Sequence, residues 1–167
     1  MRKGAQGFSL IELLIVVAII LIIAAIAIPN LLRSRIAANQ ASAVGSLRTL
    51  NTAEINYLTT YGTGYTATLG DLGPPTSGNP SATGAGLIDS IVSGGAATAT
   101  TSVKSGYKFT YSSGTADPSG RINTYSITAT PTTVGTTGTN FYYTDQSAVI
   151  RQNSTATAGS TDSPLGG

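Results

Sequence analysis

A long apolar stretch near the start of the chain limits what this sequence can fold into. It runs from residue 8 to residue 28, and one acidic residue, Glu12, interrupts it. In a helix that rises about 1.5 Å per residue, such a stretch crosses roughly 30 Å of hydrocarbon. We therefore predict a helix that spans a membrane or lies in the core of an assembly.

Glu12 needs a partner in such surroundings. An acidic residue near a bilayer centre costs about 3 kcal/mol, and an unpaired ion in a dry interior costs more. No Lys, Arg or His lies between Glu12 and Arg33, so side chains of the same helix segment cannot neutralise it. One candidate partner is a new chain terminus, formed if the basic leader, residues 1–7, is cut off after Gly7. The freed amine of Phe8 would lie one helical turn from Glu12, in its own chain or presented by the next.

Residues 7–29, GFSLIELLIVVAIILIIAAIAIP, resemble the N-terminal signature of bacterial type IV pilins and of the pseudopilins of type II secretion. The matching features are the small residue Gly7 before the cut, Phe8 after it, Glu12 as the acidic fifth residue of the mature chain, and Pro29. The resemblance implies a precursor stored in inner-membrane lipid. It also implies a prepilin peptidase that cleaves between Gly7 and Phe8 and methylates the Phe8 amine.

The same resemblance implies how the subunit is used. An inner-membrane assembly platform and its ATPase motor draw it into an extracellular homopolymer, a helical filament at the cell surface. There, Glu12 pairs with the Phe8 amine of a neighbour and sets the axial register. Related sequences carry Gly where this chain has Leu21, and Leu favours helix. Pro29 removes one backbone donor, so we expect a kink or local melting near residues 25–29.

The helix is predicted to continue to about residue 60 with one apolar face. Arg33, Arg35, Arg48 and Glu54 are interpreted as a solvated face. The apolar stripe consists of Leu32, Ile36, Val44, Leu47, Ile55 and Leu58, with Ala43, Leu50, Ala53 and Tyr57 beside it.

The rest of the globular head, residues 30–167, is predicted to be a small antiparallel sheet on this helix, an α+β, pilin-like fold rich in loops. Residues 61–102 are expected to be loop, with a turn or two of helix at residues 87–92. Alternating apolar residues place strands within 103–152, starting after Lys104. Residues 153–167 are expected to be a flexible tail, or to wrap the surface.

The sequence gives little support for catalysis or for the binding of cofactors, metals or nucleic acid. With no His and no Cys, we expect neither an enzyme nor a cofactor site. Asp117, Asp145 and Asp162 are weak calcium candidates, because related pseudopilins bind calcium, but their scattered spacing favours ordinary turn residues. The formal charge of +2 falls to zero if Arg2 and Lys3 leave with the leader, so we expect no binding of nucleic acid.

Three alternatives remain open beside a major pilin. A pseudopilin would build a periplasmic piston for secretion, and a minor pilin would prime or tip the fibre. A monomeric, membrane-anchored binding protein would use its loops to recognise a ligand. The Thr-, Ser- and Gly-rich loops and the weakly charged surface favour a surface-exposed major pilin.

Overall fold

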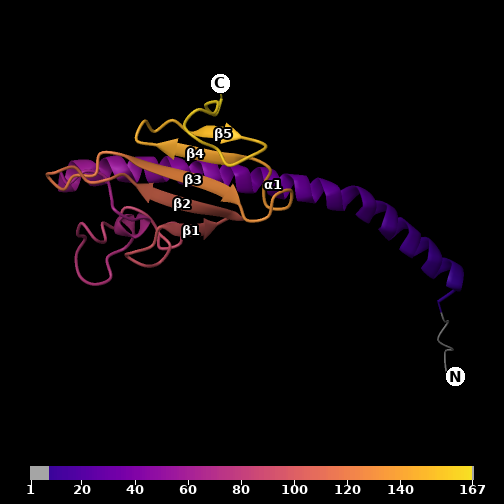
Figure 1. The fold of residues 1–167 in the computed structure, drawn as a ribbon. Helices are drawn as coiled ribbons and strands as arrows, with labels where there is room; N and C mark the ends of the chain where they lie inside the picture. The colour runs from indigo at the N-terminus through magenta and orange to yellow at the C-terminus, as the bar shows by residue number, and fades with distance from the viewer. Residues whose placement is uncertain (1–7, 167) are drawn as a thin grey trace. The chain divides into compact units, whose positions relative to one another are not determined.

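The computed structural model describes residues 8 to 166, and it divides the chain into a first unit that ends at Arg35 and a second that begins at Ile36. Helix α1, Leu10–Tyr61, belongs to both units (Figure 1). Gly62 ends it with a φ of 67°. The Gly62 N–H donates to the Leu58 carbonyl at 3.1 Å. A left-handed glycine of this kind is a common helix end.

Five strands of the second unit form one antiparallel sheet in the order β1-β2-β3-β4-β5 (Figure 1). In the pairing of the two longest strands, Phe109 faces Ala129 and Tyr111 faces Ile127. Every second residue is buried from Tyr107 to Tyr111 of β2 and throughout β3, as the alternation predicted. The bounds are β1 Thr101–Lys104, β2 Tyr107–Ser113, β3 Tyr125–Pro131, β4 Phe141–Asp145 and β5 Arg151–Asn153.

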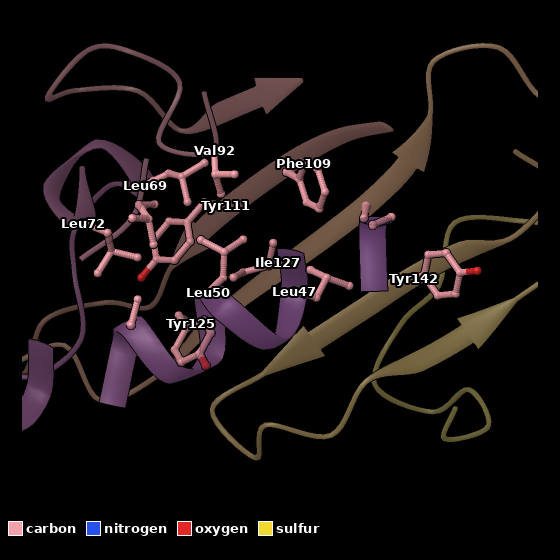
Figure 2. Close-up of a cluster of buried hydrophobic side chains, with 14 of the residues drawn as sticks. Leu47, Leu50, Leu69, Leu72, Val92, Phe109, Tyr111, Tyr125, Ile127 and Tyr142 are labelled. Atoms are coloured by element: carbon pink, nitrogen blue, oxygen red, sulfur yellow. The ribbon is translucent and has the colours of Figure 1, made fainter. Parts of the chain in front are cut away.

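The part of α1 that belongs to the second unit packs against the buried face of the sheet. Leu47 and Leu50 of α1 are fully buried in one cluster with Phe109 of β2 and Ile127 of β3 (Figure 2). Burying a side chain of this size contributes about 1.5 to 3 kcal/mol. The predicted α+β fold, a long N-terminal helix packed on a small antiparallel sheet, is therefore confirmed.

The buried face of α1 differs from the predicted stripe at several positions, two of which are neighbours. Ile55 is 47% exposed, whereas Glu54 is fully buried. The prediction that Glu54 lies on a solvated face was wrong. Its carboxylate oxygens lie 3.1 Å from the Thr66 nitrogen and 2.6 Å from the Thr66 hydroxyl, contacts that a helical pattern of apolar residues does not reveal.

The loop between α1 and the sheet contains a short 3₁₀ helix, η1, Leu69–Leu72, that the sequence analysis did not predict. Thr68 and Asp71 cap it reciprocally: the Thr68 hydroxyl accepts from the Asp71 N–H, and the Asp71 carboxylate accepts from the Thr68 N–H. This capping box satisfies two backbone donors at the start of the element. Leu69 and Leu72 are fully buried and extend the core (Figure 2).

The predicted helix at residues 87–92 is absent, because a side chain closes a turn there instead. Asp89 Oδ1 accepts from the N–H groups of Ile91 and Val92, each at 2.9 Å. Ile88 and Val92 are buried as expected, but Ile91 is 61% exposed. Aspartate favours such local turns over helix interiors.

The described part of the C-terminal segment returns along β5. Gln152 N donates to Ser163 O at 3.0 Å, and Leu165 N donates to Ile150 O at 2.8 Å. Asp162 accepts from the Asn153 amide at 3.0 Å and from the Gly159 N–H at 2.8 Å. These bonds cover the outer edge of the sheet. Of the two expectations for this segment, a flexible tail or a segment that wraps the surface, the observed path resembles the second.

Candidate assembly segment

The described part of the first unit, residues 8 to 35, exposes all of its large apolar side chains. Phe8 is 84% exposed and Leu31 is 70% exposed, and every Leu, Ile and Val between them is exposed as well. By length and composition, α1 contains a stretch that could cross a membrane, and none of that stretch is buried. A helix that is apolar all round requires lipid or other protein around it.

Glu12 lies in the first turn of this helix and contacts the backbone before it. The Ser9 N–H donates to Glu12 Oε2 at 2.9 Å. The helix hydrogen bonds begin next to it, with Leu13 N donating to Ser9 O at 3.2 Å. A carboxylate at this position is favoured by the partial positive charge of a helix N-terminus.

The backbone thus provides one partner for Glu12 that the sequence analysis did not foresee. The available signal was the spacing Ser9-x-x-Glu12, which is typical of a capping box. This contact supplies a hydrogen bond but no positive charge. Within residues 8 to 166, one ion pair is formed, between Lys104 and Asp89. Glu12 therefore has no cationic partner within the described chain.

The contact of Glu12 with Ser9 involves the residue that directly follows Phe8. The nitrogen of Ser9 already bonds the carboxylate, and the nitrogen of Phe8 is the next one back along the backbone. In the uncut chain that nitrogen is a peptide group, whereas a cut after Gly7 would make it a charged amine. Gly7 itself lies outside the described residues.

Pro29 lies inside α1, and the helix continues through it without interruption. Local melting at residues 25–29 is therefore not found. The side-chain amide of the next residue, Asn30, donates to the Ile26 carbonyl at 3.0 Å and supplies an additional hydrogen bond at this turn. A kink at Pro29 remains a prediction.

The polar residues near this segment are accessible. Arg33 and Arg35 in the first unit and Arg48 in the second are exposed, as the sequence predicted.

The aspartates considered for a metal are engaged by their own turns. Asp117 accepts from the Ser119 hydroxyl at 2.6 Å, the Arg121 N–H at 3.0 Å and the Asn123 amide at 3.0 Å. These bonds, above all the one from Ser119, hold the pKa of Asp117 well below its usual range. Asp145 accepts from the N–H and hydroxyl of Ser147. Over residues 8 to 166 the structure places no three His, Cys, Asp or Glu side chains together as metal ligands.

Comparison with known proteins gives matches to part of the chain. The family model described as the prokaryotic N-terminal methylation motif matches residues 2–28. The type IV wide pilus major component PilA4 of Thermus thermophilus is 65% identical over 37 residues, which cover 22% of this chain and 28% of that protein. The type IV major pilin protein PilA of Myxococcus xanthus is 50% identical over 52 residues, which cover 31% of this chain and 24% of that protein.

The similarity is thus confined to about a quarter of the length of each relative, 28% and 24%. No solved structure matches the chain. The residues that the family model matches, 2–28, include Phe8 and Glu12.

Proposed function

We propose, from the membership of this chain in the type IV pilin family through its N-terminal segment, that it is a subunit that polymerises into an extracellular filament. The observation that carries the proposal is the segment of residues 8–35, whose large apolar side chains are all exposed while one carboxylate lies in the first turn of α1. A polymer would bury this surface against copies of itself, at about 25 cal/mol per Å² of apolar area.

The first step of the proposed mechanism is maturation. The precursor is held in the inner membrane by residues 8–28. A prepilin peptidase cuts between Gly7 and Phe8 and methylates the new amine, which keeps its positive charge. The motif match across residues 2–28 supports this step.

The second step is assembly. An inner-membrane platform with an ATPase motor extracts the helix from lipid and adds it to the base of the filament. Glu12 then leaves water and lipid headgroups and pairs with the amine of Phe8 in a neighbouring subunit. In such a low-dielectric core a charge strongly prefers a partner, so the pair fixes the register between subunits. Small residues at Ala24, Ala25 and Ala27 allow close approach of neighbouring helices.

Mass spectrometry of the sheared extracellular fraction of producing cells tests the proposal. We expect an abundant peptide that begins at Phe8 and carries one added methyl group, because filaments released by shear consist of mature subunits. The same peptide found in the cell envelope alone would contradict an extracellular polymer and point to a pseudopilin or a minor pilin. An intact Met1 in a detergent-soluble monomer would indicate a membrane-anchored binding protein.

A further inference from the structure

The head contains a buried carboxyl group that the proposed assembly does not use. Glu54 is fully buried in the last third of α1. It contacts Thr66, in the loop that follows the helix, and Thr66 in turn contacts Tyr111 of β2. The three residues belong to the second unit and join the helix, the loop and the sheet.

No cation compensates this carboxyl group within the described residues. The groups that face it are acidic or neutral: Asp71 of η1, Tyr111 of β2, Tyr125 of β3 and Tyr57 of α1 itself. An isolated buried carboxylate is costly, and a nearby like charge increases the cost.

Counting the hydrogens available to the cluster favours a neutral Glu54. Three short oxygen–oxygen contacts follow one another: Glu54 Oε1 to Thr66 Oγ1 at 2.6 Å, Thr66 Oγ1 to the Tyr111 hydroxyl at 2.9 Å, and that hydroxyl to the Thr66 carbonyl at 2.9 Å. Each contact needs one hydrogen. The two hydroxyl groups supply only two, because a Thr or Tyr hydroxyl carries a single hydrogen.

A protonated Glu54 supplies the third hydrogen. It donates to the Thr66 hydroxyl, which donates to Tyr111, which donates to the Thr66 carbonyl. The remaining carboxyl oxygen, Oε2, accepts from the Thr66 N–H at 3.1 Å. Every donor then has an acceptor, whereas an ionised Glu54 leaves one contact without a hydrogen and a charge without a cation.

We propose that Glu54 is a neutral carboxylic acid in the folded head, and that its ionisation is a switch that loosens the junction between α1, the loop at Thr66 and β2. The geometry agrees with the direction expected from burial, which raises the pKa of Glu54 above its ordinary value.

The sign of the pH dependence follows from that direction. A carboxyl group with a higher pKa in the folded than in the unfolded state stabilises the fold fully below its unfolded pKa of about 4.3. The stabilisation is lost as the pH rises through the folded pKa. Over that interval, the folding equilibrium constant falls about tenfold per pH unit.

Carbon-13 NMR of the full chain in detergent micelles tests the inference directly. The sequence holds two glutamates, Glu12 and Glu54, so glutamate labelled at the side-chain carboxyl carbon gives two signals, and Glu54→Gln identifies one. We expect the Glu54 signal to titrate with a midpoint above about 4.3. A midpoint at or below that value would overturn the proposal.

Unfolding by urea at a series of pH values gives a second, independent readout. The stability of the wild type should fall as the pH rises above about 4.3, and Glu54→Gln should remove that part of the slope. Parallel curves for the two proteins would contradict the switch. Because these measurements use monomers in detergent, their outcome is independent of whether the chain polymerises.

Discussion

Ala148 has a backbone conformation that an L-residue rarely adopts, with a φ of 58°. It ends the turn between β4 and β5, where its N–H donates to the Asp145 carbonyl at 2.8 Å. In this conformation its own carbonyl accepts from the buried Asn51 amide at 3.2 Å. The strained residue thus connects a surface turn to a polar group in the core.

Ala148→Gly should stabilise the head by about 0.5 to 1 kcal/mol. The left-handed conformation costs an L-residue roughly 1 to 2 kcal/mol, and glycine avoids most of this while losing some entropy on folding. The exposed methyl group contributes little packing. Urea unfolding of the full chain measures the change.

Gln146→Gly in the same turn is the matched control, because Gln146 is not among the residues with positive φ. It should destabilise the head slightly. An Ala148→Gly protein no more stable than wild type would show that the backbone at this residue is not strained.

Two glutamates show how far single residues could be predicted from the sequence. Glu12 was identified because its neighbours are apolar, although its backbone partner Ser9 was missed. Glu54 was assigned to a solvated face together with the charged residues Arg33, Arg35 and Arg48. The groups that surround it come from Thr66 and Tyr111, which lie far along the sequence, so no local pattern reveals the burial.

At the scale of elements, α1 carries one glycine within its helical range, Gly45. This residue is exposed, and a Cβ added there would meet nothing within 4 Å. Gly138, between β3 and β4, is the opposite case, because its added Cβ would lie 2.1 Å from the Tyr107 hydroxyl. That hydroxyl is held by the Asn140 carbonyl at 2.8 Å, and Tyr107 is fully buried.

Gly45→Ala should therefore stabilise the head by about 0.5 to 1 kcal/mol, since alanine loses less backbone entropy in a helix. Gly138→Ala should destabilise it by about 1 to 3 kcal/mol through overpacking. Thermal unfolding followed by circular dichroism compares the two proteins. A lower midpoint for Gly45→Ala would mean that this face of α1 is not free.

The elements that were predicted correctly have a repeating apolar pattern. The long helix and strands β2 and β3 each bury residues at a regular spacing. Strand β1 is only four residues long, with Ser102 as its buried position, so it gave no apolar signal. Element η1 depends on the pair Thr68 and Asp71, whose spacing is readable in the sequence but was not used.

At the scale of the whole molecule, the two units need different surroundings. The second buries its own core, whereas the described part of the first buries none of its large apolar side chains. The exposed apolar side chains of the first unit are shielded from water only when lipid or other copies of the chain cover them. The sequence predicted this requirement, because it depends on composition over a long stretch rather than on tertiary contacts.

Substitutions of Glu12 separate its two roles in assembly. Glu12→Ala removes both the charge and the acceptor for the Ser9 N–H, whereas Glu12→Gln keeps an acceptor and removes the charge. If pairing with a neighbour's amine drives assembly, both should reduce the yield of sheared filaments at least tenfold, because a buried charge that loses its partner costs about 3 to 5 kcal/mol. Immunoblots of envelope and sheared fractions measure the yield.

Arg48→Gln, which removes an exposed charge from α1 in the second unit, serves as the control and should assemble normally. Normal filaments from Glu12→Gln together with a defect in Glu12→Ala would mean that Glu12 acts as a helix cap. Envelope levels should stay equal in all variants, which separates assembly from stability.

The C-terminal segment is fastened to β5 by backbone hydrogen bonds and by the contact between Asn153 and Asp162, and the sequence contains no cysteine. The outer edge of the sheet is therefore closed without any thiol chemistry. The head needs neither an oxidising compartment nor a disulfide-forming catalyst to reach this structure. A filament of such subunits would keep its surface unchanged in anoxic, strongly reducing surroundings, where a subunit fastened by a disulfide would open.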